Sequence, residues 1–154
     1  ALSGFPFFKL VLITNATGLH LPQVQAGLKY FTRSDEVWAK LDGGTQAYLN
    51  RINRPGVPLE KILDNILMLG RQRPVVIQSL FPAIANEEPS LEEIEQYAQR
   101  LLQLKNGGAE ISLVQVYSAA RPSANSNCGH LPLKVLSRIA QTVRQTTGLK
   151  AEVF

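Results

Sequence analysis

The feature that most constrains this chain is a regular alternation of short apolar runs with longer segments of helical periodicity. The apolar runs that we expect to form strands lie at 9–14, 36–41, 74–81, 111–117 and, more briefly, 150–154. The segments between them repeat apolar residues every three or four positions, which is typical of amphipathic helices. Strands separated by helices need crossover connections, so the sequence predicts an α/β fold with a mostly parallel sheet. These strands are too few for a closed eight-stranded barrel, and we expect an open sheet or a partial barrel.

Local signals mark where the helices begin and end. Thr45 is suited to cap a short helix, and Ser90 with Glu93 three residues later matches a capping box. Gly70 and Gly148 each follow a helical segment, so we expect both to end a helix.

Length and composition suit one ordinary globular domain. The chain has 154 residues, of which 45% are hydrophobic and 18% are charged, which is enough to bury a core. No apolar run approaches the roughly 20 residues that cross a bilayer, so we expect no membrane partner. The single cysteine, Cys128, excludes an internal disulfide and fits a reducing cytoplasm. Together with His130 it is too little for a metal site.

The net charge of +4 permits an anionic partner such as a nucleotide or RNA. Most basic residues are scattered along the chain. The local enrichment consists of Arg51, Arg54, Arg71 and Arg73, and no aromatic residues interleave with it as single-strand binding requires. Charge alone is therefore weak support for a nucleic-acid partner.

Hydrogen-bonding side chains close four of the expected strands. They are Thr14, Asn15, Lys40, Asp42, Gln78, Ser79, Gln115 and Tyr117. Because the carboxyl ends of parallel strands share one rim, these residues predict a site for a polar small molecule. An aspartate can accept hydrogen bonds from ribose hydroxyls, and a lysine can pair with a carboxylate. The alternative is that they only mark where strands meet solvent, with Lys40 and Asp42 paired to each other.

The segment Gly43-Gly44-Thr45 follows directly after Asp42. Backbone N–H groups at the start of a helix can bind an anion, and glycine allows close approach to the backbone. The segment lacks the spacing of a phosphate-binding loop, so a turn with an N-cap is the alternative.

Three segments, in this order, resemble the radical S-adenosylmethionine (radical SAM) superfamily, specifically the carboxyl-terminal part of its partial (β/α)6 barrel. Residues 12–17 (LITNAT) resemble the end of the family's third strand, and residues 37–45 (VWAKLDGGT) resemble its fourth-strand segment. Residues 48–55 (YLNRINRP) look like the segment that follows in a branch labelled Fe–S oxidoreductases, related to wybutosine-synthesis enzymes. The resemblance covers nearly the whole chain.

The resemblance implies that the chain is the later part of a longer protein. In the family, a three-cysteine loop after the first strand binds a [4Fe–4S] cluster, and a Gly-Gly-Glu-Pro segment after the second binds the methionine amine of the cofactor. Neither segment occurs here, and a cluster needs several thiolates. We therefore expect S-adenosylmethionine and [4Fe–4S] in the full-length protein, which would form a 5′-deoxyadenosyl radical. We expect this chain to be inactive alone, with the missing amino-terminal part as its partner.

The resemblance also assigns roles to the strand ends. The implied cofactor-binding residues are Thr14, Asn15, Lys40, Asp42, Gln78, Ser79 and Tyr117. Residues 40 and 42 would face the ribose or carboxylate of the cofactor, and residues 78 and 79 the adenine or the substrate. Two alternatives remain open: a non-catalytic α/β module that binds a nucleotide or another anion, and a half-barrel that self-associates through an exposed sheet edge.

Overall fold

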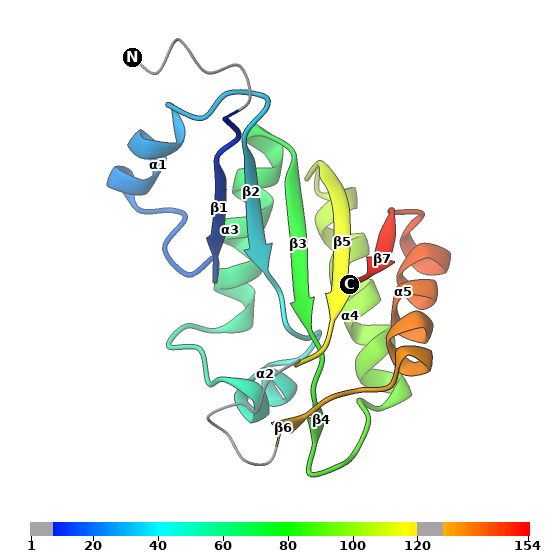
Figure 1. Cartoon of the computed structure of the whole chain (residues 1–154). Helices are drawn as coiled ribbons and strands as arrows, with labels where there is room; N and C mark the ends of the chain where they lie inside the picture. Colours follow the sequence, from blue (N-terminus) through cyan, green and yellow to red (C-terminus); the bar gives the residue numbers. More distant parts are fainter. Residues whose placement is uncertain (1–7, 120–127) are drawn as a thin grey trace.

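A five-stranded parallel sheet forms the centre of the computed structural model, which describes residues 8–119 and 128–154 (Figure 1). In sheet order, the strands are β1 (Val11–Thr14), β2 (Glu36–Lys40), β3 (Val75–Leu80), β5 (Ile111–Tyr117) and β7 (Ala151–Val153). Each strand is parallel to its neighbours. The predicted α/β class and parallel sheet are confirmed. The strands have the same order in the sheet as in the sequence, which is the arrangement found in a partial (β/α) barrel.

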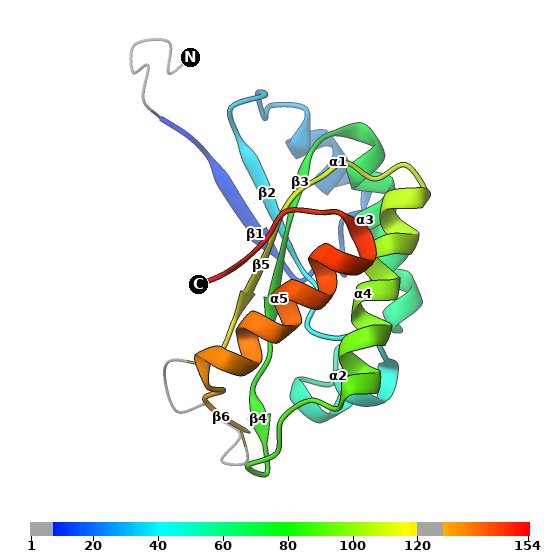
Figure 2. The same ribbon diagram turned by 90° about the vertical axis from the view of Figure 1, so that its right-hand side faces the viewer.

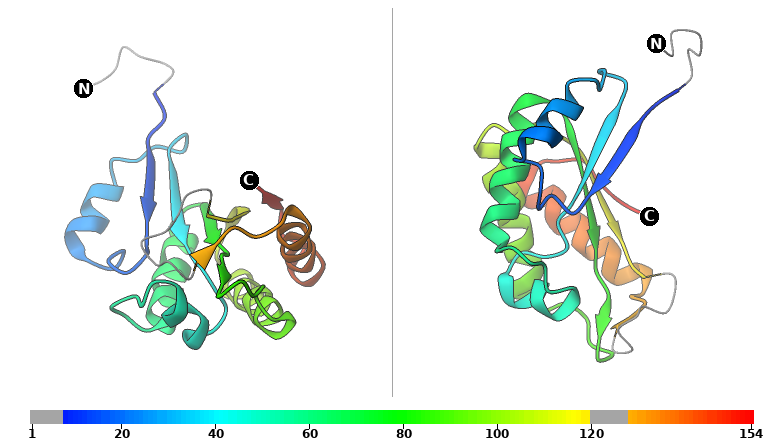
Figure 3. Two further views of the ribbon diagram at one scale, coloured as in Figure 1. Left: turned by 60° about the horizontal axis from the view of Figure 1, so that its bottom comes forward. Right: turned by 90° about the vertical axis from the view of Figure 1, so that its left-hand side faces the viewer.

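Helices follow the strands along the chain. They are α1 (Pro22–Leu28), α2 (Gln46–Ile52), α3 (Leu59–Gln72), α4 (Leu91–Asn106) and α5 (Leu133–Thr147). The three long helices, α3, α4 and α5, lie on the same face of the sheet (Figure 2). Within the part of the chain that the structure describes, no helix covers the opposite face (Figure 3). None of the helices in this part is both long and apolar enough to cross a membrane.

Alternation along the strands separates a core face from a face that we call the open face. Val37, Ala39, Ile77, Val114 and Val116 are fully buried and pack toward the helices. The residues between them point the other way and form the open face: Trp38, Lys40, Val76, Gln78, Leu80, Leu113, Gln115 and Tyr117. Burial of apolar area against the helices therefore fixes which side chains remain available for a ligand.

The helix ends follow the sequence signals in most places. The Thr45 hydroxyl accepts a hydrogen bond from Tyr48 N at 3.2 Å, which confirms the N-cap of α2. Gly148 ends α5 with a left-handed φ of 69°, as predicted. The prediction for Gly70 was wrong, because α3 continues to Gln72. A β-carbon on Gly70 would lie 2.6 Å from Ala109 Cβ. Glycine at this position within α3 therefore allows Ala109, from the segment before β5, to pack closely against the helix.

A second, very short antiparallel sheet lies near the carboxyl ends of the main strands (Figure 1). It pairs β4 (Ala83–Ile84) with β6 (Cys128–Gly129). The segment from Ser118 to Gly129 is rich in Ser, Asn, Pro and Gly, a composition that predicts a polar loop. Its last two residues form β6 instead, and residues 120–127 lie outside the described part of the chain.

The carboxylate of Glu93 joins the end of β2 to the beginning of α4. Its oxygens accept hydrogen bonds from Gly44 N at 2.6 Å, from Thr45 N at 3.2 Å and from the Thr45 hydroxyl at 2.6 Å. The Ser90 hydroxyl accepts from Glu93 N at 3.1 Å, which confirms the first half of the predicted capping box. The Glu93 side chain does not turn back to its own helix as a capping box requires, but holds the turn after β2.

Gly44 is required at this junction because the backbone of α4 lies against it. A β-carbon on Gly44 would lie 2.1 Å from Tyr97 N and 2.5 Å from Gln96 C. Backbone atoms of a helix cannot move aside as the end of a flexible side chain can. The second glycine of the Gly-Gly pair is thus explained by packing.

We predict that Gly44→Ala destabilises the chain by about 3 kcal/mol or more, because the clash involves helix backbone. The control is Gly27→Ala, since a β-carbon on Gly27 meets nothing within 4 Å. Alanine is the better helix former, so the control should stabilise by up to about 1 kcal/mol. Urea unfolding measures both changes. Equal stability of the two variants would contradict the close packing of the turn against α4.

Candidate functional site

A row of polar residues crosses the open face near the carboxyl ends of the strands. Lys40 on β2 is paired in register with Gln78 on β3, Gln78 with Gln115 on β5, and Gln115 with Glu152 on β7. Gln78 Nε2 donates to Gln115 Oε1 at 3.4 Å. Polar side chains therefore occupy one level of four neighbouring strands.

Lys40 and Tyr117 meet across this row. Lys40 Nζ donates to Tyr117 Oη at 2.8 Å and lies 5.4 Å from the centre of its ring. The residues come from β2 and β5, which are separated by β3, so only the assembled sheet brings them together. A lysine ammonium has three donors, and one is used here.

Asp42 completes the group, which we call the Lys40 cluster (Lys40, Asp42 and Tyr117). Its carboxylate is 4% exposed, lies 3.5 Å from Lys40 Nζ through Oδ2, and accepts from Leu80 N at 2.9 Å through Oδ1. The pairing of Lys40 with Asp42, which the sequence left open as the alternative to a ligand role, is present in the structure. The hydrogen bond from Leu80 N anchors the Asp42 carboxylate to the end of β3.

Burial and charge act in opposite directions on the two ionisable groups. Burial raises the pKa of Asp42 above its ordinary value, although Lys40 and the Leu80 N–H favour the charged form. Burial by itself would lower the pKa of Lys40, but the Asp42 carboxylate and the Tyr117 hydroxyl outweigh it, and the net direction is upward. Lys40 therefore carries its positive charge at neutral pH.

The cluster is chemically suited to a ligand with carboxylate or hydroxyl groups. Lys40 offers a fixed positive charge and a remaining N–H donor. Tyr117 accepts from Lys40, so its own hydroxyl hydrogen remains available. The side-chain amides of Gln78 and Gln115 supply further donors and acceptors on the same face.

Three other residues predicted for the site lie apart from the Lys40 cluster. Ser79 follows Gln78 on β3 and so points to the core face, where its hydroxyl lies 2.5 Å from Tyr97 Oη and is fully buried. Thr14 Oγ1 accepts from Ala16 N at 3.1 Å. Asn15 is exposed, and its Oδ1 accepts from Thr17. The structure thus brings together Lys40, Asp42, Gln78 and Tyr117. The sequence analysis missed Glu152, which is paired in register with Gln115; the alternation of side chains along the short last strand could have indicated it.

Two other features are accounted for within the chain. The N–H groups of Gly44 and Thr45, considered for an anion, are engaged by Glu93. His130 Nδ1 lies 3.1 Å from Ala119 O, while Cys128 is half-buried in β6. Among the described residues, no three His, Cys, Asp or Glu side chains are grouped as a metal site requires.

We predict that Asp42→Ala destabilises the chain by about 2–4 kcal/mol, because it leaves Leu80 N without an acceptor and Lys40 without its counter-charge. Asp42→Asn loses the same counter-charge but keeps an amide oxygen that can accept from Leu80 N, so it should cost about 1–2 kcal/mol less than the alanine variant. Unfolding by urea at pH 7 measures both variants. An asparagine variant as unstable as the alanine variant would show that the charge is the dominant contribution.

Comparison with known proteins identifies a fold. No protein-family model and no curated protein matches this sequence. Among solved structures, the chain is similar to a radical SAM methyltransferase from Sphaerobacter thermophilus, with a TM-score of 0.65 and 17% identity over 94% of this chain. The chain spans 39% of the length of that protein. At this identity the likeness concerns architecture alone: this chain shares the partial-barrel α/β fold of a part of that protein.

Proposed function

We propose that this chain is the carboxyl-terminal part of a radical SAM enzyme and that the Lys40 cluster lines its cofactor and substrate pocket. The observation that carries the proposal is that Lys40 at the end of β2, Asp42 just after it and Tyr117 at the end of β5 meet on the open face, at the carboxyl ends of the strands. In a barrel this face is the interior, and this end of the strands is where ligands bind. The fold likeness supports the same assignment.

We also propose the branch of Fe–S oxidoreductases related to wybutosine-synthesis enzymes. The support is the order and spacing of the sequence segments 12–17, 37–45 and 48–55. The structural relative is a radical SAM methyltransferase, so a methyl-transfer reaction is the competing assignment for the full-length protein.

The donor set on the open face fits S-adenosylmethionine in part. The ammonium of Lys40 suits the carboxylate of the cofactor or a substrate, and Tyr117 and Gln78 suit its hydroxyls or ring nitrogens. When bound in a complete enzyme, the cofactor supplies the radical chemistry. The part played by these residues is to hold an anionic or hydroxylated group at a fixed place on the sheet.

The residues of this chain do not fit the iron–sulfur cluster. Such a cluster needs several cysteine thiolates, and the sequence contains Cys128 as its single cysteine. We propose that the cluster is bound by a preceding part of a longer protein and that this chain by itself is inactive.

The edge of the sheet at β1 offers a place for that preceding part. β1 is the outermost strand and pairs only with β2 among the described strands. Val11 and Ile13 on this strand are 42% and 56% exposed. An apolar edge strand of this kind needs a cover, and we propose preceding β/α units, with a second copy of the chain as the alternative.

The test uses the longest native protein that contains this segment. We expect Lys40→Met to weaken binding of S-adenosylmethionine by about tenfold or more, because a charge-assisted contact is lost. Equilibrium dialysis without oxygen measures the affinity. The control is Lys134→Met on α5, which removes the same charge from an exposed position on the helix face. Unchanged affinity in Lys40→Met, with the fold intact by circular dichroism, would remove the cluster from the cofactor site.

A further inference from the structure

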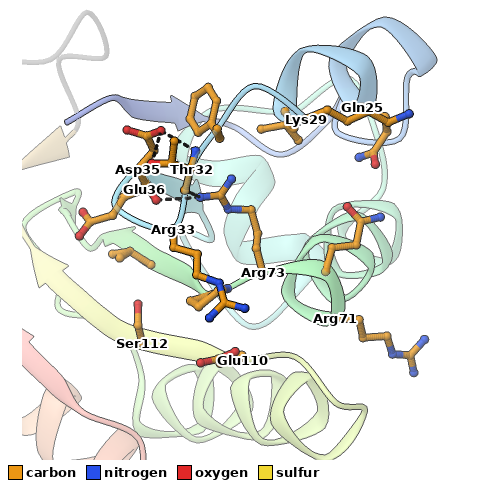
Figure 4. A pocket seen from close by; sticks show the side chains of 15 residues that line it. Gln25, Lys29, Thr32, Arg33, Asp35, Glu36, Arg71, Arg73, Glu110 and Ser112 are labelled. Carbon is orange, nitrogen blue, oxygen red and sulfur yellow. Dashed lines mark hydrogen bonds between the residues drawn. The ribbon is translucent and has the colours of Figure 1, made fainter. Parts of the chain in front are cut away.

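A cavity of about 920 Å³ lies at the opposite end of the sheet from the Lys40 cluster (Figure 4). Its lining comes from α1 and the segment that follows it, from the end of α3, and from the beginnings of β2, β3 and β5. These are the amino ends of the strands. The cavity is therefore separate from the proposed cofactor surface.

Basic residues from two stretches of the chain, the connection after α1 and the end of α3, surround this cavity. They are Lys29, Arg33, Arg71 and Arg73. Figure 4 shows Arg33 extending into the space, Arg73 reaching toward Thr32 and Asp35, and Arg71 pointing outward at the border. Arg71 and Arg73 belong to the basic enrichment seen in the sequence, and the fold places them apart from its other members, Arg51 and Arg54 on and after α2.

The guanidinium of Arg73 is held in place and still has unused donors. Its Nη2 donates to Thr32 O at 3.0 Å and to Asp35 O at 2.7 Å, and the group lies 5.4 Å from the centre of the Phe31 ring. Its Nε is buried without an acceptor. A fixed guanidinium loses little freedom when it binds an anion.

The acidic residues of the lining are largely engaged by the protein itself. Asp35 accepts from Leu10 N at 2.8 Å, from Thr32 N at 2.7 Å and from the Thr32 hydroxyl at 3.0 Å, and these bonds hold its pKa below the ordinary value. Glu36 pairs with Lys9 and accepts from Trp38 Nε1 at 2.8 Å. The positive charge of Arg73 also contributes to the lowered pKa of Asp35, so each of these two carboxylates is already engaged with a cation of the chain.

Two of the cations remain available. Within 8–119 and 128–154, no acceptor pairs with the side chain of Lys29 or of Arg33, and both are exposed. Arg71 donates through its Nε to the neutral carbonyl of Gly107 at 2.8 Å and has no carboxylate partner among the described residues. Glu110 is the remaining carboxylate of the lining, so four cationic side chains stand against three carboxylates and the lining has a net charge of +1.

We propose that this cavity is a binding site for the phosphate group of a small phosphorylated molecule. Guanidinium groups that approach from different segments match the several acceptor oxygens of a phosphate dianion. The apolar walls formed by Leu28, Pro74 and Val76 suit the uncharged part of such a ligand. This site goes beyond the proposed radical SAM function and does not depend on it.

The experiment titrates inorganic phosphate, and in a second arm ribose 5-phosphate, into the ¹⁵N-labelled chain while amide NMR shifts are recorded. Thr32, Arg33 and Arg73 should shift in a saturable manner, and the Lys40 cluster should not. The double variant Lys29→Gln, Arg33→Gln should weaken binding by about tenfold or more, since both side chains lack a structural partner. The matched control is Arg51→Gln, Arg54→Gln, which removes the same net charge outside the cavity and should change affinity by less than about twofold.

If the two double variants weaken phosphate binding equally, phosphate is attracted only by the net charge of the protein, and the proposed site is overturned. Absence of saturable shifts at this end of the sheet would also overturn it. If ribose 5-phosphate binds more tightly than inorganic phosphate, the result supports a small phosphorylated molecule as the ligand. A single-stranded RNA that binds here when neither small probe does would contradict the proposal in favour of a nucleic-acid surface. None of these outcomes bears on S-adenosylmethionine binding at the other end.

Discussion

The contact between Glu93 and the turn after β2 determines much of the geometry in this protein. One buried carboxylate accepts hydrogen bonds from two backbone N–H groups and a hydroxyl, and it draws Gly44 against the backbone of α4. Donors of this kind left without an acceptor in the interior would cost about 1–3 kcal/mol each. The contact therefore fixes where the chain goes immediately after Asp42.

That fixed turn has a consequence on the other side of the sheet. Asp42 stands two residues before Gly44, and its carboxylate is held by Leu80 N at the end of β3. Lys40 then lies between Asp42 and Tyr117. A largely buried ion pair is weak evidence for stability, because removing two charges from water is expensive. We take its position on the open face as a reason to assign it to ligand binding, in keeping with the proposed function.

Most of the architecture could be predicted because it depends on local periodicity and local caps. The apolar runs gave the five parallel strands, and Thr45 and Gly148 marked two helix limits. The errors have physical causes. Gly70 looked like a helix stop because its contact with Ala109, distant in sequence, cannot be seen in the local pattern. β4 and β6 are too short to show any periodicity.

The grouping of polar residues at the strand ends could be predicted from the sequence, but which of them lie together could be predicted only in part. Gln78 and Ser79 are neighbours on one strand, so they point to opposite faces and could not both line one pocket. The alternation of side chains along a strand therefore already indicated that Ser79 would point to the core face. The role of Glu93 could not be predicted in the same way, because its partner turn is 48 or 49 residues away and the capping-box pattern favours a local partner.

The measurement that tests the central claim most directly is the iron and sulfide content of protein purified without oxygen. It is made once on this chain and once on the longest native protein that contains it. If the chain is one part of a radical SAM barrel, the longer protein should contain about four irons per chain with the absorption of a [4Fe–4S] cluster, and this chain should contain none. A cluster in this chain alone, or a longer protein that holds neither iron nor S-adenosylmethionine, would contradict the account.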